Sequence, residues 1–182
     1  NANVGNNFSS KLLRIASESN KWHNLATMPK YLAKLHEVGD LYYHDLDSYN
    51  LTTNCLHIPT KEVLEKGFNT GYGTINVPKR IETAAELSCI LLQSTQNDML
   101  GGQSHPDFDN DMLIFIEPTR QEIRKELSDL GIEESRMDEL VEKKLIDRVH
   151  QAMQGVIYNL NTMHSRAGSQ VPFSSINLGI PK

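Results

Sequence analysis

Residues 51–58 read Leu51-Thr52-Thr53-Asn54-Cys55-Leu56-His57-Ile58, a short β-prone run that places one cysteine between two turn signals. Side chains of a strand alternate between its two faces, so Asn54 and Leu56 are expected on one face. Thr53, Cys55 and His57 are expected on the other. We predict that Cys55 lies buried on this strand and faces the interior, where a thiol is better placed for chemistry than for packing.

The overall composition is that of a globular protein large enough for one domain. The 182 residues are 38% hydrophobic and 23% charged, and the formal net charge is −5. A negative charge argues against general nucleic-acid binding, which usually needs a basic surface. No apolar run approaches the ~20 residues of a membrane span, and no signal peptide is visible. Cys55 and Cys89 form no CxxC or zinc pattern, so we expect reduced thiols and a cytoplasmic protein.

Neither end of the sequence resembles a domain boundary. The sequence begins at Asn1 without a methionine and stops at Lys182, just after a second strand-like run over residues 171–178. We therefore expect residues 1–182 to be a single partial domain of a longer protein.

Apolar spacing and breaker residues predict a mostly helical chain. Helices are expected over residues 8–19, 29–39, 60–66, 79–98, 107–130 and 135–164, and a glycine-rich loop over residues 67–74. The fifth helix is expected to bend at Pro118, and Ser135 with Asp138 resembles a capping box for the sixth. Two strands far apart in the sequence favour parallel pairing through a crossover. The fold class is therefore α/β and helix-rich.

The helix predicted over residues 79–98 carries a stripe of small side chains, among them Ala84 and Ala85, beside Cys89. Small side chains permit close approach of two helices, so we expect this helix to contribute to a self-association surface. Packing against the chain's own core is the alternative. Cys89 itself is expected to be a core residue.

Several short motifs occur in one order along nearly the whole chain. They are Tyr43-His44-Asp45-Leu46-Asp47, Thr53-Asn54-Cys55, Gly67-Phe68, Pro78-Lys79, Gly101-Gly102, and Gly168-Ser169-Gln170-Val171-Pro172-Phe173 through Asn177-Leu178-Gly179. In this order they resemble the anaerobic (class III) ribonucleoside-triphosphate reductases, which are glycyl-radical enzymes. The resemblance implies a ten-stranded α/β barrel made of two antiparallel five-stranded halves. This chain would be a fragment of it, holding the first strands and the dimer-interface helices.

The resemblance also implies what lies outside this chain: an ATP-binding cone, the radical-loop cysteine, a zinc site and the glycyl-radical tail. The fragment is therefore expected to be inactive alone. The whole enzyme would reduce ribonucleoside triphosphates for DNA synthesis, using a glycyl radical, structural zinc, and formate or a thiol reductant as electron source. Its partners would be a second copy in a homodimer, dNTP or ATP effectors, and an iron–sulfur radical-SAM activating protein, with no nucleic acid or membrane.

Cys55 matches the family cysteine on the first barrel strand, and the resemblance gives it the role of hydrogen donor to the ribose radical. That task needs an S–H group, and apolar surroundings keep a thiol protonated. Leu51, Leu56 and Ile58 would supply such surroundings. A buried structural cysteine is the alternative.

Five polar residues near the two strands are candidates for substrate binding: Asn54, His44, Ser174, Ser175 and Asn177. Alternation directs the Asn54 side chain away from the cavity, which favours a strand-positioning role. His44 is equally well explained by a hydrogen bond to a neighbouring carboxylate, and some relatives carry a histidine two positions earlier, at Tyr42. Ordinary strand hydrogen bonding is the alternative for the serines and Asn177.

Lys79 and Arg80 are candidates for effector binding. We expect Pro78-Lys79-Arg80 to begin a helix, whose free amides and two cations favour a phosphate group at the dimer interface. A solvated first-turn lysine is the alternative. The run of aspartates after His105 and Pro106 is expected to be helix-start chemistry, and no metal site is expected. A non-catalytic module for dimerisation and effector binding is the alternative function.

Overall fold

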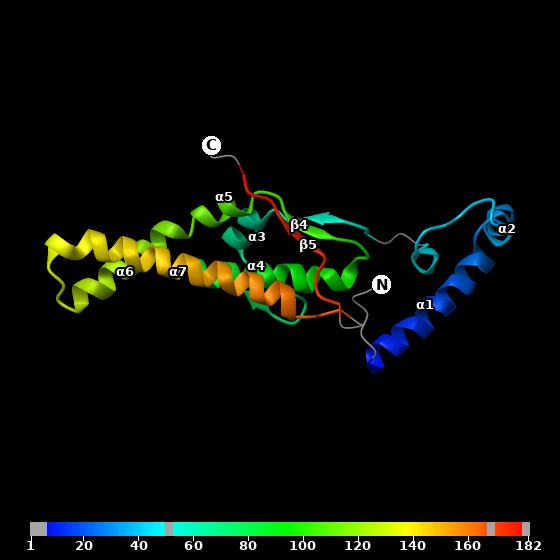
Figure 1. Ribbon diagram of the computed structural model, residues 1–182, viewed down its shortest axis with the longest axis horizontal. Coiled ribbons are helices and arrows are strands. Elements are labelled where there is room, and N and C mark those ends of the chain that lie inside the picture. The colour runs from blue at the N-terminus through cyan, green and yellow to red at the C-terminus, as the bar shows by residue number, and fades with distance from the viewer. Residues whose placement is uncertain (1–6, 50–52, 167–169, 180–182) are drawn as a thin grey trace.

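The computed structural model describes residues 7–49, 53–166 and 170–179. Helices dominate this part of the chain (Figure 1). They are α1 (Phe8–Thr27), α2 (Lys30–Val38), α3 (Thr60–Lys66), α4 (Ile81–Thr95), α5 (Phe108–Leu113), α6 (Ile116–Asp129) and α7 (Glu134–Thr162), with short 3-10 helices η1 (Leu46–Ser48) and η2 (Gln96–Asp98). The strands are β1 (Leu56–His57), β2 (Phe68–Asn69), β3 (Thr74–Ile75), β4 (Gln103–His105) and β5 (Ser174–Ile176). The predicted helix-rich α/β class is confirmed.

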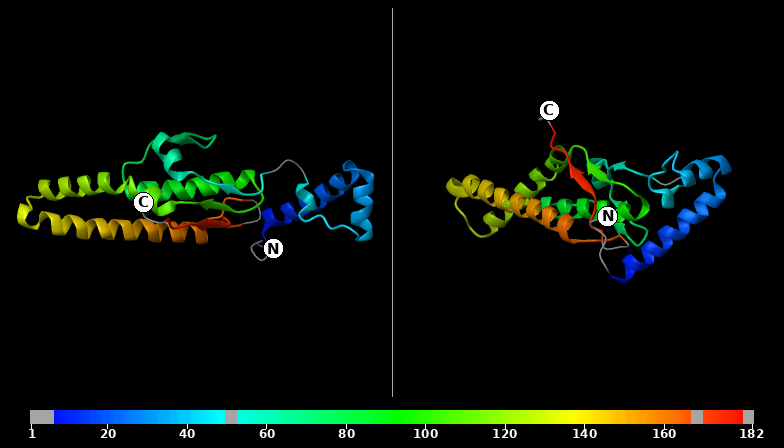
Figure 2. Two further views of the ribbon diagram at one scale, coloured as in Figure 1. Left: turned by 90° about the horizontal axis from the view of Figure 1, so that it is seen from above. Right: turned by 45° about the vertical axis from the view of Figure 1, so that its right-hand side comes forward.

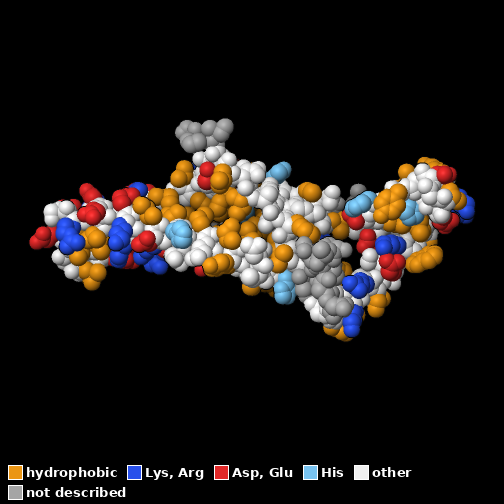
Figure 3. Space-filling model, viewed as in Figure 1, with side chains coloured by type: hydrophobic (Ala, Val, Ile, Leu, Met, Phe, Trp, Pro, Cys, Tyr) orange, Lys and Arg blue, Asp and Glu red, His pale blue; other side chains and the backbone are white. Residues whose placement is uncertain are grey.

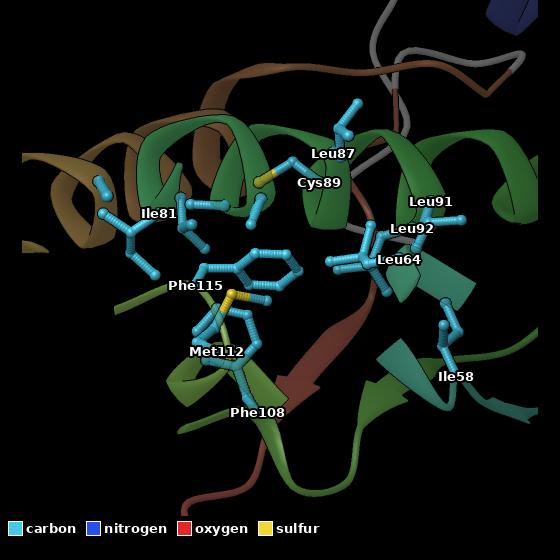
Figure 4. Packing of buried hydrophobic residues seen from close by; sticks show 14 residues of the cluster. Ile58, Leu64, Ile81, Leu87, Cys89, Leu91, Leu92, Phe108, Met112 and Phe115 are labelled. Carbon is cyan, nitrogen blue, oxygen red and sulfur yellow. The ribbon is translucent and has the colours of Figure 1, made fainter. Parts of the chain in front are cut away.

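The main core lies around α4, which packs against α7 along most of its length (Figures 1 and 2). Figure 4 shows side chains from α3, α4 and α5 meeting beneath α4. Ala84 and Ala85 are 0% and 1% exposed, so the small-residue stripe faces the chain's own core. The predicted self-association surface on this stripe is therefore wrong. The small side chains instead allow α4 to lie close to α7. Cys89 is 2% exposed and belongs to the same core, as expected.

Helices α6 and α7 form an antiparallel hairpin with a core of its own, made by Ile123, Leu127, Met137, Val141 and Leu145. Charged side chains gather at the far end of this hairpin (Figure 3). Arg124 there pairs with Glu134 and Asp138. Such exposed pairs contribute little to stability. Among the described helices, none is both long and apolar enough to span a membrane.

Helices α1 and α2 form an arm beside this body (Figure 2). Met28, Ala33 and Leu46 make its small core, and Asn24 Nδ2 donates a hydrogen bond of 2.8 Å to the Leu46 carbonyl. The structure places the end of α1 at Thr27, beyond the predicted end at residue 19. The helices predicted over residues 29–39 and 60–66 are confirmed.

A three-stranded parallel sheet has the order β1-β4-β5. Strand β4 was not predicted and lies between β1 and β5, so the predicted direct pairing of those two strands is wrong, although the predicted parallel direction is right. Gly101-Gly102 and Pro106 bound a strand of only three polar residues, which a search for apolar runs does not detect. Strand β4 is nevertheless the buried centre of the sheet.

Five further predictions of local structure need correction. The helix predicted over residues 107–130 is two helices, interrupted at Ile114–Phe115. Pro118 lies in the first turn of α6, where its missing N–H has no intrahelical partner to lose, so no bend is needed there. Helix α4 begins at Ile81 because Arg80 is extended, with φ −128° and ψ 152°. Helix α7 begins at Glu134, so Ser135 is inside the helix.

The fifth correction concerns residues 67–74, predicted as a loop. They contain β2 and part of β3, which pair as an antiparallel hairpin. Gly67 makes the hairpin possible, because its φ is +71° and a Cβ there would lie 2.4 Å from the carbonyl oxygen of Ile75.

Candidate active site

One face of the parallel sheet packs on α4. Leu56, Gln103 and Ser174 are directly opposite one another on the three strands. The buried Gln103 Nε2 donates to the Leu92 carbonyl at 2.9 Å, and the Thr95 hydroxyl donates to Gln103 Oε1. This row therefore faces the helical core.

The next row along the strands faces the opposite way, because side chains alternate. It consists of His57, Ser104 and Ser175. His57 and Ser175 are exposed, and Ser104 is 6% exposed. Cys55 precedes His57 by two residues and so shares its face. We call this side of the sheet the open face.

A cleft of about 410 Å³ lies at the sheet. It is lined by Cys55, Leu56, His57, Gly102, Gln103, Ser104, Phe173, Ser174 and Ser175. Three of the residues proposed from the sequence thus meet in one place, namely Cys55, Ser174 and Ser175. His57 and Ser104 join them, and neither was proposed from the sequence as a site residue.

Cys55 is exposed and lies one residue before β1, so the prediction of a buried cysteine on the strand is wrong for this chain. The physical reason is that α4 covers the other face of the sheet, whereas the open face presents exposed side chains at Cys55, His57 and Ser175. The prediction that Cys55 forms no disulfide with Cys89 is confirmed, since both cysteines are free. Burial raises the pKa of the Cys89 thiol to about 11, consistent with a packing role.

The position of Cys55 depends on a close backbone contact. The Gly101 N–H donates to the Asn54 carbonyl at 2.6 Å. A Cβ at Gly101 would lie 2.4 Å from that oxygen, 2.7 Å from Asn54 Oδ1 and 3.0 Å from Cys55 Sγ. Asn54 thus lies against Gly101 and does not line the cleft. This placement fits its expected strand-positioning role.

His57 and Ser104 form a polar pair inside the cleft. His57 Nδ1 lies 2.5 Å from Ser104 Oγ, across the β1–β4 pairing. The alternation argument had already placed His57 on the face of Cys55. Ser104 had no such signal, because β4 was not recognised as a strand.

Two other candidates from the sequence lie outside the cleft. His44 Nδ1 is 2.8 Å from Asp45 Oδ2, and both side chains are largely exposed, which matches the carboxylate-partner alternative. Asn177 contributes its backbone to a junction: its N–H donates to the His105 carbonyl at 3.0 Å, and its carbonyl accepts from Phe108 N at 3.2 Å.

The segment Pro78-Lys79-Arg80 precedes α4 and does not begin it, so the predicted helix start is wrong. Lys79 is exposed. Arg80 forms an ion pair with Glu122, and the Ile81 N–H donates to Thr119 Oγ1 at 3.0 Å. One cation and one amide of the expected phosphate site are therefore already engaged within the chain.

The aspartates after His105 accept hydrogen bonds at the start of α5. Asp109 Oδ1 accepts from the Gly179 N–H at 2.7 Å, and this hydrogen bond holds the pKa of Asp109 below its usual value. Asp107 Oδ1 accepts from Asn110 Nδ2 at 2.6 Å. Within the described residues, no three His, Cys, Asp or Glu side chains are grouped so that they could hold a metal ion.

His105 lies on the core-facing side of β4 and is 0% exposed. Its Nδ1 is 2.5 Å from Thr60 Oγ1, while its buried Nε2 has no hydrogen-bond partner in the part of the chain described. Burial lowers the pKa of His105 from 6.5 to about 4, so the ring is neutral at pH 7.

Acidification is expected to destabilise the fold through His105. Between pH 6.5 and about 4 the unfolded chain binds a proton at this residue and the folded chain does not, so the free energy of unfolding falls as the pH falls. The shift corresponds to about 3 kcal/mol. Urea unfolding at pH 7 and pH 4.5 should show a smaller loss in a His105→Leu variant than in the parent. A variant at exposed His164, His164→Leu, should behave as the parent, and equal pH dependence in all three proteins would contradict the expectation.

The whole chain, residues 1–182, matches the family model described as anaerobic ribonucleoside-triphosphate reductase. The chain belongs to this family. Among curated anaerobic ribonucleoside-triphosphate reductases, that of Escherichia coli K12 is 28% identical over 155 residues, covering 84% of this chain and 21% of that protein. That of Enterobacteria phage T4 is 27% identical over 154 residues, covering 84% and 25%. The chain thus spans about a fifth to a quarter of the length of these reductases.

Solved structures of anaerobic ribonucleotide reductase have the same fold over nearly all of this chain. The enzyme from Thermotoga maritima in complex with dATP and CTP aligns with a TM-score of 0.66 and 19% identity, covering 93% of this chain and 28% of that one. The same enzyme with dATP bound in the specificity site gives a TM-score of 0.65 at 19% identity, with the same coverage. The expected relationship to a larger reductase fold is confirmed.

Proposed function

We propose that this chain forms part of the substrate site of an anaerobic ribonucleoside-triphosphate reductase, with Cys55 as hydrogen donor to the ribose. The whole enzyme would convert ribonucleoside triphosphates to deoxyribonucleoside triphosphates in the cytoplasm. The observation that carries this proposal is the position of Cys55 in a cleft at the sheet, beside the side chains of His57 and Ser175 on the open face. Membership of the reductase family and the CTP bound by the Thermotoga maritima enzyme support the nature of the substrate.

The chemistry of the cleft suits a nucleotide. Its volume of about 410 Å³ is within the usual range for small-molecule sites. The Ser175 hydroxyl and the His57 ring offer hydrogen bonds to sugar and phosphate oxygens, and Ser174 borders the cleft from the adjacent row. Cys55 at the same face presents a thiol to the sugar.

Hydrogen-atom transfer defines the task of Cys55. After the 2′ hydroxyl has left as water, the S–H bond of Cys55 breaks and a C–H bond forms at the ribose radical. The unpaired electron then resides on sulfur, and formate or a thiol reductant supplies the reducing equivalents. The glycyl radical, when present in the whole enzyme, supplies the radical that starts the reaction.

The open face has to be closed for this chemistry, because an exposed thiyl or ribose radical would meet solvent and oxidants. We propose that the remaining strands of the ten-stranded barrel cover it in the whole enzyme, and that they bury Cys55. The structural zinc and the radical glycine are likewise assigned to parts of the whole enzyme outside this chain.

Regulation is the second element of the proposal. The whole enzyme would form a homodimer, bind dNTP or ATP effectors, and receive its radical from an iron–sulfur radical-SAM protein. Lys79 is the better candidate for effector phosphate, because it is exposed whereas Arg80 is paired with Glu122. The dATP in the specificity site of the Thermotoga maritima enzyme supports effector binding as a family property.

The test is ribonucleotide reduction by the full-length protein under anaerobic conditions after radical activation. We expect deoxyribonucleoside triphosphate formed from each accepted substrate, and none without the activating protein. Effector binding without any reduction in an activated sample would instead favour the non-catalytic module for dimerisation and effector binding.

A further inference from the structure

The cleft contains a hydrogen-bonded pair, His57 and Ser104, that has no role in the chemistry proposed for Cys55. Both residues line the cleft, on adjacent strands and in the same row of the sheet. Ser104 is 6% exposed, and its hydroxyl holds His57 Nδ1 at 2.5 Å. Within the described residues, His57 Nε2 has no hydrogen-bond partner, and the ring is exposed on the open face.

We propose that His57 is a substrate-binding residue whose ring is fixed by Ser104 and whose Nε2 hydrogen-bonds an oxygen of the sugar–phosphate part of the nucleotide. This inference rests on the proposed function, because it takes the ligand to be the ribonucleoside triphosphate in the Cys55 cleft. Ser104 is a positioning residue, since it acts through the His57 ring.

The spacing along β1 determines which part of the nucleotide His57 can reach. Residues two apart on one strand face are separated by about 6.6 Å along the strand. If Cys55 meets the reacting ribose carbon, His57 lies about one sugar ring further on. It is then beside the sugar or the first phosphate, both of which present acceptor oxygens. The neighbouring hydroxyl of Ser175 adds a donor at the same place, while the Ser104 hydroxyl donates to His57 Nδ1.

A purely structural role explains the pair less well. A histidine that only satisfies a buried serine needs one ring nitrogen, and Ser104 could be satisfied by backbone or water as serines usually are. The hydrogen bond to Ser104 instead fixes the orientation of the exposed His57 ring. Fixing a side chain before the ligand arrives lowers the entropic cost of binding.

Two substitutions of His57 separate the functions of its two ring nitrogens. His57→Asn places an amide near the position of Nδ1, so it can keep the Ser104 contact but loses Nε2. His57→Gln places an amide near the position of Nε2, so it can keep the nucleotide contact but loses Ser104. The two variants are matched in polarity, and both replace the same exposed side chain.

The experiment is calorimetric titration of the unactivated full-length protein with the four ribonucleoside triphosphates. With the nucleotide that the parent binds most tightly, we expect His57→Asn to raise Kd about tenfold, which is about 1.4 kcal/mol. His57→Gln should stay within about threefold of the parent, and Ser104→Ala should raise Kd about threefold. In the activated enzyme the His57→Asn loss should appear in KM more than in kcat, a split that a general loss of stability would not produce.

Equal Kd values for His57→Asn and the parent would overturn the assignment of His57 and leave the proposed function standing. A larger loss for His57→Gln than for His57→Asn would also overturn it, because the Ser104 contact would then be the one that matters. A parent protein that binds none of the four nucleotides would overturn the proposed function, and this inference with it.

Discussion

Replacing Cys55 by serine is expected to lower deoxyribonucleotide formation by the activated full-length enzyme by more than about a thousandfold. Such a loss corresponds to a barrier raised by about 4 kcal/mol. The reason is that serine preserves size and polarity but offers an O–H bond, which is much harder to break homolytically than S–H. Nucleotide affinity should change little, because the cleft keeps its other eight lining residues. Activity is measured as product formed per radical, and affinity by calorimetry.

Cys89 provides the matched control. It is 2% exposed in the core around α4, so Cys89→Ala should keep activity while lowering the free energy of unfolding by about 1 kcal/mol. Parent-like turnover in the Cys55→Ser variant would remove Cys55 from the chemistry. The cysteine would then be a structural residue.

A methyl group added at Gly101 is expected to have the second largest effect. The new Cβ would lie 2.4 Å from the Asn54 carbonyl oxygen and 3.0 Å from Cys55 Sγ, and the first of these atoms belongs to the backbone. The Gly101→Ala variant must therefore shift β1 relative to β4, and overpacking of this kind costs about 1–3 kcal/mol. We expect this loss of stability together with at least about a tenfold loss of activity, because Cys55 moves with the strand.

Gly73→Ala tests whether that effect is specific. A Cβ at Gly73 meets no atom within 4 Å, so stability and activity should remain close to those of the parent. Both variants are measured by chemical denaturation and by turnover of the activated enzyme. A Gly101→Ala variant as stable and active as Gly73→Ala would mean that the β1–β4 contact does not set the position of Cys55.

Local sequence signals were sufficient where a helix is bounded by proline and glycine. Helix α2 follows Pro29 and ends at Gly39, whose φ is +85°, and α3 lies between Pro59 and Gly67. These residues fix the backbone by their own covalent structure, independently of distant partners. The same local signals failed at Ser135, because a helix start depends on which of several polar residues the chain turns at.

Strand β4 could not be predicted, because its structure depends on distant partners and not on local residues. Its side chains are Gln103, Ser104 and His105, which have no strand pattern, and they are buried only because α3, α4 and the neighbouring strands supply their hydrogen-bond partners. Long-range pairing, and not local propensity, places this segment in the sheet. Ser104 was missed as a site residue as a consequence.

For the site, alternation along residues 53–57 predicts Cys55 and His57 on the same side of the strand, and both line the cleft. Burial of Cys55 was not predictable from the same pattern, because burial depends on what covers the open face. In the described residues only the opposite face is covered, by α4. The sequence therefore indicates which side chain is the candidate, and the surrounding strands determine its solvent exposure.

The most direct test is a crystal structure of the unactivated full-length protein with a bound ribonucleoside triphosphate. We expect the ribose on the open face, with its 2′ carbon about 3.5 Å from Cys55 Sγ and with His57 and Ser175 beside the nucleotide. A ribose bound elsewhere, with no sugar carbon in reach of Cys55, would contradict the assignment of this cleft as the substrate site.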